Sequence, residues 1–456
     1  MDKKAYQRPN IVRHIPGVAQ KFGRSQTLKT KGAIDGVPVK EIMARHGSPV
    51  FVFSERRIRS AFRNALRAFT TRYPKVQFAW SYKTNYLDAV CNIFHQEGSW
   101  AEVVSEYEYE MARSNGIPGN HILYNGPYKP EPALRRAISE GARIHIDHLD
   151  ELFMIEKIAR DLDKPVDAAI RVNMDAGIYP VWDRFGFNLD NGEAMKAAQR
   201  IHAGGMIRLT GVHSHIGTYV TETSAYGTAT AKLAALVRAV EKSYGFTIDY
   251  IDVGGGFSSQ STLHTMYAPG RESNPPVEQY AEAITGAMYE AGFPPDRLPT
   301  LLLETGRALI DAAGYLLTSV VGNKRLPNGT RTMIVDGGVN LLFTSTWYQH
   351  DILPAEAKEG LYEETVIYGP LCMNIDVVRP SVSLPVMEPG DALVIHPVGA
   401  YNVTQWMQFI RMRPAVVLIG ENREIDLIRD AEVVETLKDL EHVPDRFRSL
   451  QLALTA

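Results

Sequence analysis

The sequence predicts an α/β fold, a (β/α)8 TIM barrel followed by a C-terminal β domain. From residue 76 onward, short β-rich runs alternate with longer amphipathic segments, which is typical of a parallel sheet covered by helices. The candidate polar residues end many different strands, which favours a barrel over an open doubly wound sheet with one switch point. The eight expected strands are 76–82, 101–105, 121–125, 143–147, 168–173, 209–215, 250–253 and 300–304.

Helices are expected between these strands, and the pattern changes after them. The helical segments are 87–97, 108–115, 131–140, 149–161, 192–203, 228–243 and 277–291. After about residue 311, short strands separated by Pro, Gly and Asn turns predict a β domain, at 320–321, 333–335, 365–367, 392–395 and 415–419. The run 50–53 also has strand character. We therefore expect residues 1–54 to be an N-terminal extension with a strand that joins the β domain, 55–310 to be the barrel, and 311–456 to be the β domain.

The composition is that of an ordinary globular protein. The chain has 456 residues, with 49 basic and 52 acidic side chains, so we expect no electrostatic attraction to nucleic acid or to an anionic membrane. No apolar run approaches the roughly 20 residues that span a bilayer, and no secretory signal is evident, which predicts a cytoplasmic protein. Its two cysteines, Cys91 and Cys372, are expected to be thiols. We expect the basic segment 1–31 to be a surface extension, with a targeting presequence as the alternative.

Three consecutive glycines, Gly254, Gly255 and Gly256, follow the seventh expected strand. Residues without a Cβ allow backbone N–H groups to approach a phosphate closely. Barrels often place a phosphate site after strands seven and eight, so position and composition agree. A flexible turn is the alternative explanation.

Two histidines and a carboxylate–arginine pair end neighbouring strands. His213 and His215 are two residues apart, so both face the same side of the sixth strand, and that side could be the lumen. No third ligand stands beside them at metal-ligand spacing, so we expect no metal site. Glu304 ends the eighth strand and Arg307 follows one turn later. A carboxylate favours the protonated form of a pyridine nitrogen, whereas an ion pair between Glu304 and Arg307 would be purely structural.

Lys83 stands where the first barrel strand gives way to a turn, in the run 78–85 (FAWSYKTN). A lysine amine there can form an imine with an aldehyde cofactor, and pyridoxal phosphate is the commonest of these. Most lysines after a strand are solvated surface charges, so the residue is informative only together with the other motifs.

In this order, the motifs resemble those of the fold-type III pyridoxal-phosphate decarboxylases, in the branch that contains diaminopimelate and ornithine decarboxylases. The resemblance covers about residues 50–415 and includes the segments 369–376 (GPLCMNID) and 399–401 (GAY). It implies an alanine racemase-like barrel, pyridoxal 5'-phosphate as cofactor, release of carbon dioxide from an amino acid, and a homodimer with its active sites at the interface.

The resemblance also implies roles for individual residues. Lys83 would be the Schiff-base lysine, and Cys372 of the second subunit would deliver a proton to the substrate carbon. His215 would stack on the cofactor ring, and Glu304 would pair with the pyridine nitrogen. The phosphate would be held by Gly254, Gly255, Gly256 and Tyr401, and Arg307 would lie near the phosphate or a substrate carboxylate. Asp376 of the second subunit would contact a distal amine.

Two departures from the diaminopimelate enzymes predict a different substrate. Met373 stands where those enzymes carry a glutamate for the distal amino group, and Thr344 where they carry an arginine for the distal carboxylate. A buried charge left without its partner costs on the order of 2–5 kcal/mol. We therefore expect a family decarboxylase with an altered pocket. An amino-acid racemase and a non-catalytic regulatory homologue remain the alternatives, although Glu304 and Cys372 argue against the first and an intact Lys83 against the second.

Overall fold

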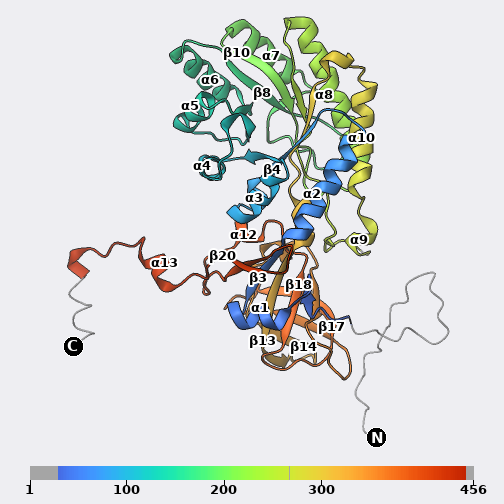
Figure 1. Cartoon of the computed structure of the whole chain (residues 1–456), viewed down its shortest axis with the longest axis vertical. Coiled ribbons are helices and arrows are strands. Elements are labelled where there is room, and N and C mark those ends of the chain that lie inside the picture. Colours follow the sequence, from blue (N-terminus) through green and yellow to red (C-terminus); the bar gives the residue numbers. More distant parts are fainter. Residues whose placement is uncertain (1–28, 267, 448–456) are drawn as a thin grey trace, which may run out of the picture.

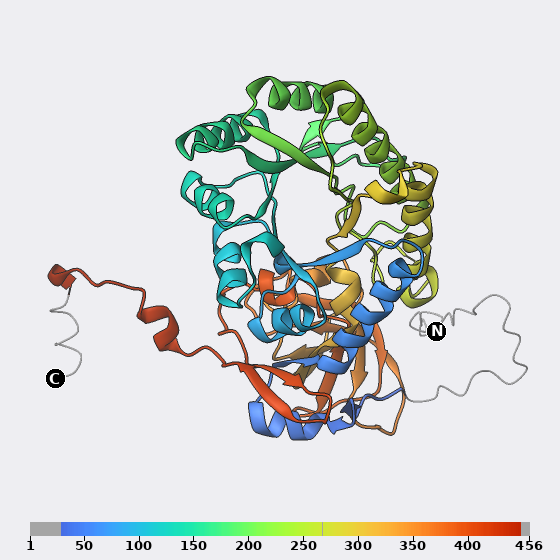
Figure 2. The same ribbon diagram turned by 45° about the horizontal axis from the view of Figure 1, so that its top comes forward.

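Eight parallel strands close into a barrel in the computed structural model, which describes residues 29–266 and 268–447 (Figures 1 and 2). β12 pairs with β4, and β10 pairs with both β8 and β11, so the ring has no open edge. The strands are β4 (Val76–Ser81), β5 (Trp100–Val103), β6 (Ile122–Tyr124), β7 (Arg143–Ile146), β8 (Val166–Asn173), β10 (Ile207–His213), β11 (Tyr250–Asp252) and β12 (Thr300–Leu303). All eight lie where the sequence predicts them, and the predicted barrel is confirmed.

Helices cover the outside of the barrel, as Figure 2 shows. They are α3 (Asp88–Gln96), α4 (Glu106–Ser114), α5 (Glu131–Ser139), α6 (Leu149–Asp161), α7 (Glu193–Gly204), α8 (Thr223–Tyr244) and α10 (Val277–Glu290). The sequence analysis did not anticipate α2 (Glu55–Thr70), which begins where the side chain of Ser54 accepts a hydrogen bond from the amide of Arg57. None of the described helices is long and apolar enough to cross a membrane. The cytoplasmic location stays a prediction.

The second sheet combines strands from both ends of the chain. β3 (Val50–Ser54) pairs with β13 (Gly314–Arg325) and with β19 (Val416–Ile419), so the blue strand lies among orange and red ones in Figure 1. This pairing agrees with the expectation that the run 50–53 joins the later sheet. The exact domain boundaries stay a prediction, and residues 1–28 of the basic extension lie outside the described part of the chain.

The other strands of the β domain include some that the sequence did not indicate. The expected ones are β14 (Arg331–Val335), β16 (Glu363–Tyr368) and β18 (Ala392–His396). The additional ones are β15 (Asp351–Pro354), β17 (Val377–Leu384) and β20 (Ile425–Arg429). β17 contains Arg379, Pro380 and two serines, so its composition is unlike that of a buried strand.

The β domain contacts the barrel at the carboxyl ends of its strands. The amide of Tyr401 donates to the carbonyl of Thr84 at 2.9 Å, and Asn85 Nδ2 donates to the carbonyl of Gly399 at 3.4 Å. Thr84 belongs to the turn η1 (Tyr82–Thr84) that follows β4, and Tyr401 precedes α12 (Asn402–Gln405). Segments far apart in sequence therefore meet beside Lys83.

Candidate active site

A cavity of about 580 Å³ opens at the carboxyl ends of the barrel strands. This is the end at which (β/α)8 enzymes carry their active sites, and the volume lies within the roughly 300–1,000 Å³ of small-molecule sites. Seven of the residues that the sequence singled out line it: Lys83, His213, His215, Gly256, Glu304, Arg307 and Tyr401.

Lys83 forms an ion pair with Glu102, a fully buried residue of β5. The Glu102 carboxylate also accepts hydrogen bonds from Ser81 Oγ at 2.6 Å and from Asn125 Nδ2 at 3.0 Å. Burial lowers the pKa of Lys83, but the carboxylates of Glu102 and then Glu304 outweigh that effect and raise the pKa above its usual value. Lys83 is therefore charged in this arrangement. Its side chain retains 35% of its exposure, because it reaches into the cavity.

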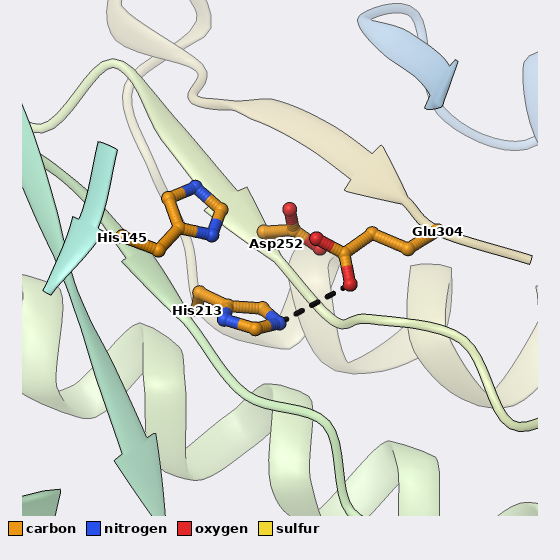
Figure 3. Close-up of side chains that lie close together, drawn as sticks. All are labelled: His145, His213, Asp252 and Glu304. Atoms are coloured by element: carbon orange, nitrogen blue, oxygen red, sulfur yellow. Dashed lines mark ion pairs between the residues drawn. The ribbon is translucent and has the colours of Figure 1, made fainter. Parts of the chain in front are cut away.

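Glu304 lies at the floor of the cavity, in a buried group of four side chains (Figure 3). Its Oε1 accepts a hydrogen bond from Asn125 Nδ2 at 2.5 Å, and its Oε2 lies 3.3 Å from His213 Nε2. His145 and Asp252 complete the group, with one ligand atom from each of the four within 4.8 Å of the others. Spacing along the chain does not reveal this group, because the closed barrel brings three further potential ligands beside His213. That no metal binds stays a prediction.

The protonation states of this group leave one negative charge at the floor. Burial holds the pKa of His145 and His213 well below the usual histidine value, and burial together with Glu304 holds the pKa of Asp252 well above its own. Burial also raises the pKa of Glu304, but the ammonium of Lys83 and nearby polar groups outweigh it, and the pKa is lowered. These shifts favour neutral imidazoles and a protonated Asp252, and they favour the anion of Glu304. A single buried anion suits a protonated pyridine nitrogen.

His215 follows β10 and faces the cavity with its ring held in place. Its Nδ1 accepts a hydrogen bond from the amide of Gly255 at 3.1 Å, and its ring centre lies 5.3 Å from that of Trp182. Burial lowers the pKa of His215 to about 3, so the ring is neutral. His213 and His215 both line the cavity, as their even spacing predicts.

The three glycines serve packing as well as the cavity. A Cβ on Gly255 would lie 2.4 Å from the carbonyl oxygen of Glu304, and one on Gly256 would lie 2.1 Å from that of Gly217. The amide of Gly254 donates to Asp252 at 2.8 Å, while that of Gly255 is the donor to His215. Of the three, Gly256 alone lines the cavity. The expectation that all three amides face a phosphate is therefore corrected: two of them hold the floor and His215.

Arg307 is a buried cation without a carboxylate partner among the described residues. Its guanidinium lies 4.7 Å from the ring centre of Tyr348 and 4.8 Å from that of Tyr401. The structural ion pair with Glu304 that the sequence left open does not form, since Glu304 pairs with His213 instead. A buried charge requires an opposite one, so this end of the cavity suits a phosphate or a carboxylate.

Asp376 does not line the cavity of its own chain, and its expected contact with a distal amine from a second subunit stays a prediction. The side chain is buried, and its Oδ1 and Oδ2 accept hydrogen bonds from the amides of Val339 at 2.8 Å and Leu371 at 2.7 Å. Both oxygens are used within the β domain.

Thr344 also lies outside the cavity lining. Its Oγ1 donates to Asn402 Oδ1 at 2.9 Å and lies 3.2 Å from His350 Nε2, so these contacts lie within the β domain, and its place in the substrate pocket stays a prediction. Cys372 is exposed and Met373 partly exposed, on the loop after β16, and neither lines the cavity of its own chain. Their predicted place at the active site of a second subunit stays a prediction.

Several residues at the cavity were missed by the sequence analysis. Glu102 and Asn125 stand at or just after the ends of β5 and β6, so the strand-end rule that found Lys83 could have found them. Arg171 near the end of β8 is a similar case. No local signal distinguishes Trp182, which reaches the cavity from the irregular segment 174–186.

The fold and the cavity define a pyridoxal-phosphate enzyme, and the sequence of the chain identifies its family. The chain belongs to the pyridoxal-dependent decarboxylases, because the sequence model of their pyridoxal binding domain matches residues 56–311. It is 30% identical to a diaminopimelate decarboxylase of Methanothermobacter thermautotrophicus, over 91% of this chain and 96% of that one. It is 29% identical to the diaminopimelate decarboxylase of Methanocaldococcus jannaschii, over 90% and 95% of the two chains.

Comparison with solved structures agrees with this family assignment. The crystal structure of the M. jannaschii diaminopimelate decarboxylase has a TM-score of 0.83 and 28% identity, and the match covers 92% of this chain and 98% of that one. The protein is thus a pyridoxal-phosphate-dependent amino-acid decarboxylase, a carboxy-lyase with the expected barrel and β domain. The residues at the cavity fit the cofactor, since a lysine, the buried carboxylate of Glu304 and an arginine without a carboxylate partner among the described residues stand around one space.

Proposed function

We propose that this enzyme decarboxylates an amino acid other than meso-diaminopimelate. The observation that carries the proposal is Thr344, which stands where the diaminopimelate enzymes carry an arginine, and whose side chain is bonded to Asn402 outside the cavity lining. Met373 likewise replaces the glutamate for the distal amino group. Relatives near 30% identity share the chemistry, but the substrate depends on individual side chains.

The proposed roles at the cavity follow from charge and position. Lys83 holds the cofactor through Nζ, and Arg307 binds the phosphate or the substrate carboxylate. Glu304 holds a proton on the pyridine nitrogen, because its anion stabilises that cation. The bound cofactor supplies an electron sink for the pair of electrons left when the carboxylate departs. His215 is neutral and fixed by Gly255, so its ring can lie against the cofactor without adding a charge.

Two protons must move for turnover. The ammonium of Lys83 has to lose a proton before Nζ can act as a nucleophile, and Glu102 is already paired with it to accept that proton. We further propose that the enzyme is a homodimer and that Cys372 of a second subunit returns a proton to the substrate carbon. The exposure of Cys372 on its own chain supports this role.

The test is carbon dioxide release by the reconstituted enzyme from meso-diaminopimelate and from a panel of other amino acids in both enantiomeric forms. We expect kcat/KM for meso-diaminopimelate to lie at least about a hundredfold below that of the best substrate, consistent with the loss of two charged contacts. Chiral chromatography of the recovered amino acids checks the racemase alternative. Racemisation without carbon dioxide release would contradict a decarboxylase.

A further inference from the structure

The acidic groups of the cavity are confined to its floor and are already engaged. Glu102 and Glu304 are the carboxylates among the described residues that line it. Glu102 pairs with Lys83, and Glu304 with Asn125 and His213. Asp376 does not line the cavity of its own chain, and each of its oxygens accepts a hydrogen bond from a main-chain amide. A substrate with a distal ammonium group would therefore find no free carboxylate here, and leaving that charge unpaired is costly.

The outer wall of the cavity is aromatic. Trp182 and Phe185 come from the segment 174–186 after β8, and Trp347 and Tyr348 follow the turn η5 (Phe343–Thr346). Trp347 is 47% exposed, which is unusual for so large an apolar side chain at a cavity. Small-molecule sites are typically lined by apolar and aromatic side chains with a few polar groups that fix orientation.

Cations already lie against these aromatic rings. The guanidinium of Arg171 lies 4.6 Å and that of Arg184 5.1 Å from the ring centre of Phe185. The guanidinium of Arg307 takes a similar position at Tyr348. A second cation would meet charge repulsion there, so the aromatic wall does not suit a substrate ammonium.

In the proposed dimer, the loop 369–376 of a second subunit would add further apolar side chains to the cavity. It carries Met373, and Ile375 is 69% exposed in the single chain. An apolar side chain that is this exposed on a short loop suits a contact with an apolar surface.

We propose that the cavity selects an amino acid whose side chain ends in an uncharged aromatic or long aliphatic group, and that Trp182 and Trp347 recognise it. This inference rests on the proposed function and refines its substrate class. The charged residues at the floor bind the amino and carboxylate groups common to all α-amino acids, and the aromatic wall contacts the side chain.

The experiment compares phenylalanine and leucine with lysine, ornithine and glutamate, as both enantiomers and at equal concentration, on the reconstituted enzyme. Carbon dioxide release measures turnover, and the change in cofactor absorbance measures binding independently. We expect the best uncharged amino acid to exceed every charged one by at least about tenfold in kcat/KM, the scale of an apolar pocket's discrimination.

Variants identify the recognising residues. Trp182→Ala and Trp347→Ala should each raise KM for phenylalanine by about tenfold or more while changing kcat/KM for alanine, whose side chain is short, by less than about threefold. Trp182→Phe should restore most of the binding. Asp183→Ala is the matched control, because Asp183 is exposed in the same segment and does not line the cavity.

A preference for lysine, ornithine or glutamate would overturn the inference but leave the decarboxylase intact. Equal losses for alanine and phenylalanine in the tryptophan variants would also overturn it, since they would indicate a structural role. The inference would also be overturned if no uncharged amino acid changed the absorbance band of the cofactor. The complete absence of a cofactor band and of carbon dioxide release would instead overturn the proposed function.

Discussion

His213 Nε2 lies 3.3 Å from Oε2 of Glu304, which places a neutral imidazole against the anion of this buried group of four side chains (Figure 3). The burial that neutralises His213 and Asp252 leaves Glu304 charged, because Asn125 and Lys83 favour its ionised form. The barrel thus concentrates a single negative charge where a protonated ring nitrogen would need it. This distribution of charge leads to the first prediction.

Glu304→Gln should lower kcat by about 10²–10³-fold, the usual cost of losing one preorganised electrostatic contact. The substitution keeps the shape of the side chain and removes its charge. Asp252→Asn should cost much less, because burial and the neighbouring Glu304 raise the pKa of Asp252 and favour its neutral form. Steady-state kinetics at saturating cofactor would measure both. Equal losses in the two variants would show that the anion is not localised on Glu304.

Lys83→Ala should abolish measurable turnover and leave the protein folded. Loss of acid–base assistance alone costs about 10²–10⁴-fold, and loss of the link to the cofactor adds to it. Circular dichroism checks the fold, and borohydride treatment checks whether a reducible bond to the cofactor exists. Turnover within tenfold of the wild type would rule out the assigned role.

The sequence predicted the site residues that stand at the ends of barrel strands. It could not predict the contacts that form only when distant segments pack together. Lys83, Glu304 and Arg307 were found because parallel strands bring their carboxyl ends to one side of a barrel. His145 was not, since it lies within β7 and its proximity to His213 arises only when the barrel closes. The hydrogen bonds of Asp376 could not be predicted for a related reason: its motif indicates a carboxylate near the site, but only the fold shows that its two oxygens accept hydrogen bonds from main-chain amides.

Subunit mixing tests the proposed shared active site. If Cys372 acts across a dimer interface, inactive Lys83→Ala and inactive Cys372→Ala subunits should together recover about a quarter of the wild-type activity. Half of randomly formed dimers are mixed, and each mixed dimer has one intact site out of two. Activity after equimolar unfolding and refolding, or after subunit exchange, is the measurement. No recovery despite demonstrated exchange would place both residues at the site of one chain.

The stability of the barrel should fall as the pH rises through neutrality, because of Glu108. Burial raises the pKa of Glu108 from 4.5 to about 7, while its Oε2 accepts a hydrogen bond from the amide of Val104 at 2.7 Å. Between these pH values the folded protein keeps a proton that the unfolded chain has released. The stabilisation is therefore present below pH 4.5 and is lost above pH 7, with a magnitude of up to about 3 kcal/mol.

Glu108→Gln should remove this loss, since glutamine does not ionise. The difference in melting temperature between pH 5 and pH 8, measured by circular dichroism, should become smaller than in the wild type. Glu106→Gln is the matched control, because Glu106 is exposed in the same first turn of α4 and should leave the difference unchanged. An identical pH dependence in wild type and Glu108→Gln would show that Glu108 ionises normally in the folded state.

Restoring the two missing charges should shift the preference of the enzyme toward meso-diaminopimelate. Met373→Glu supplies an acid for the distal amino group, and Thr344→Arg supplies a cation for the distal carboxylate. The second change also removes the hydrogen bond from Thr344 to Asn402, so we expect the longer arginine to leave the β domain and reach toward the cavity at some cost in stability.

The double variant should raise kcat/KM for meso-diaminopimelate by about tenfold or more, and each single variant by less, because each leaves one charge unpaired. The ratio of kcat/KM for meso-diaminopimelate to that for the best substrate, compared across the four proteins, measures the shift. If the unaltered protein already reached a kcat/KM of about 10⁴ M⁻¹s⁻¹ on meso-diaminopimelate, the inference from Met373 and Thr344 would be wrong.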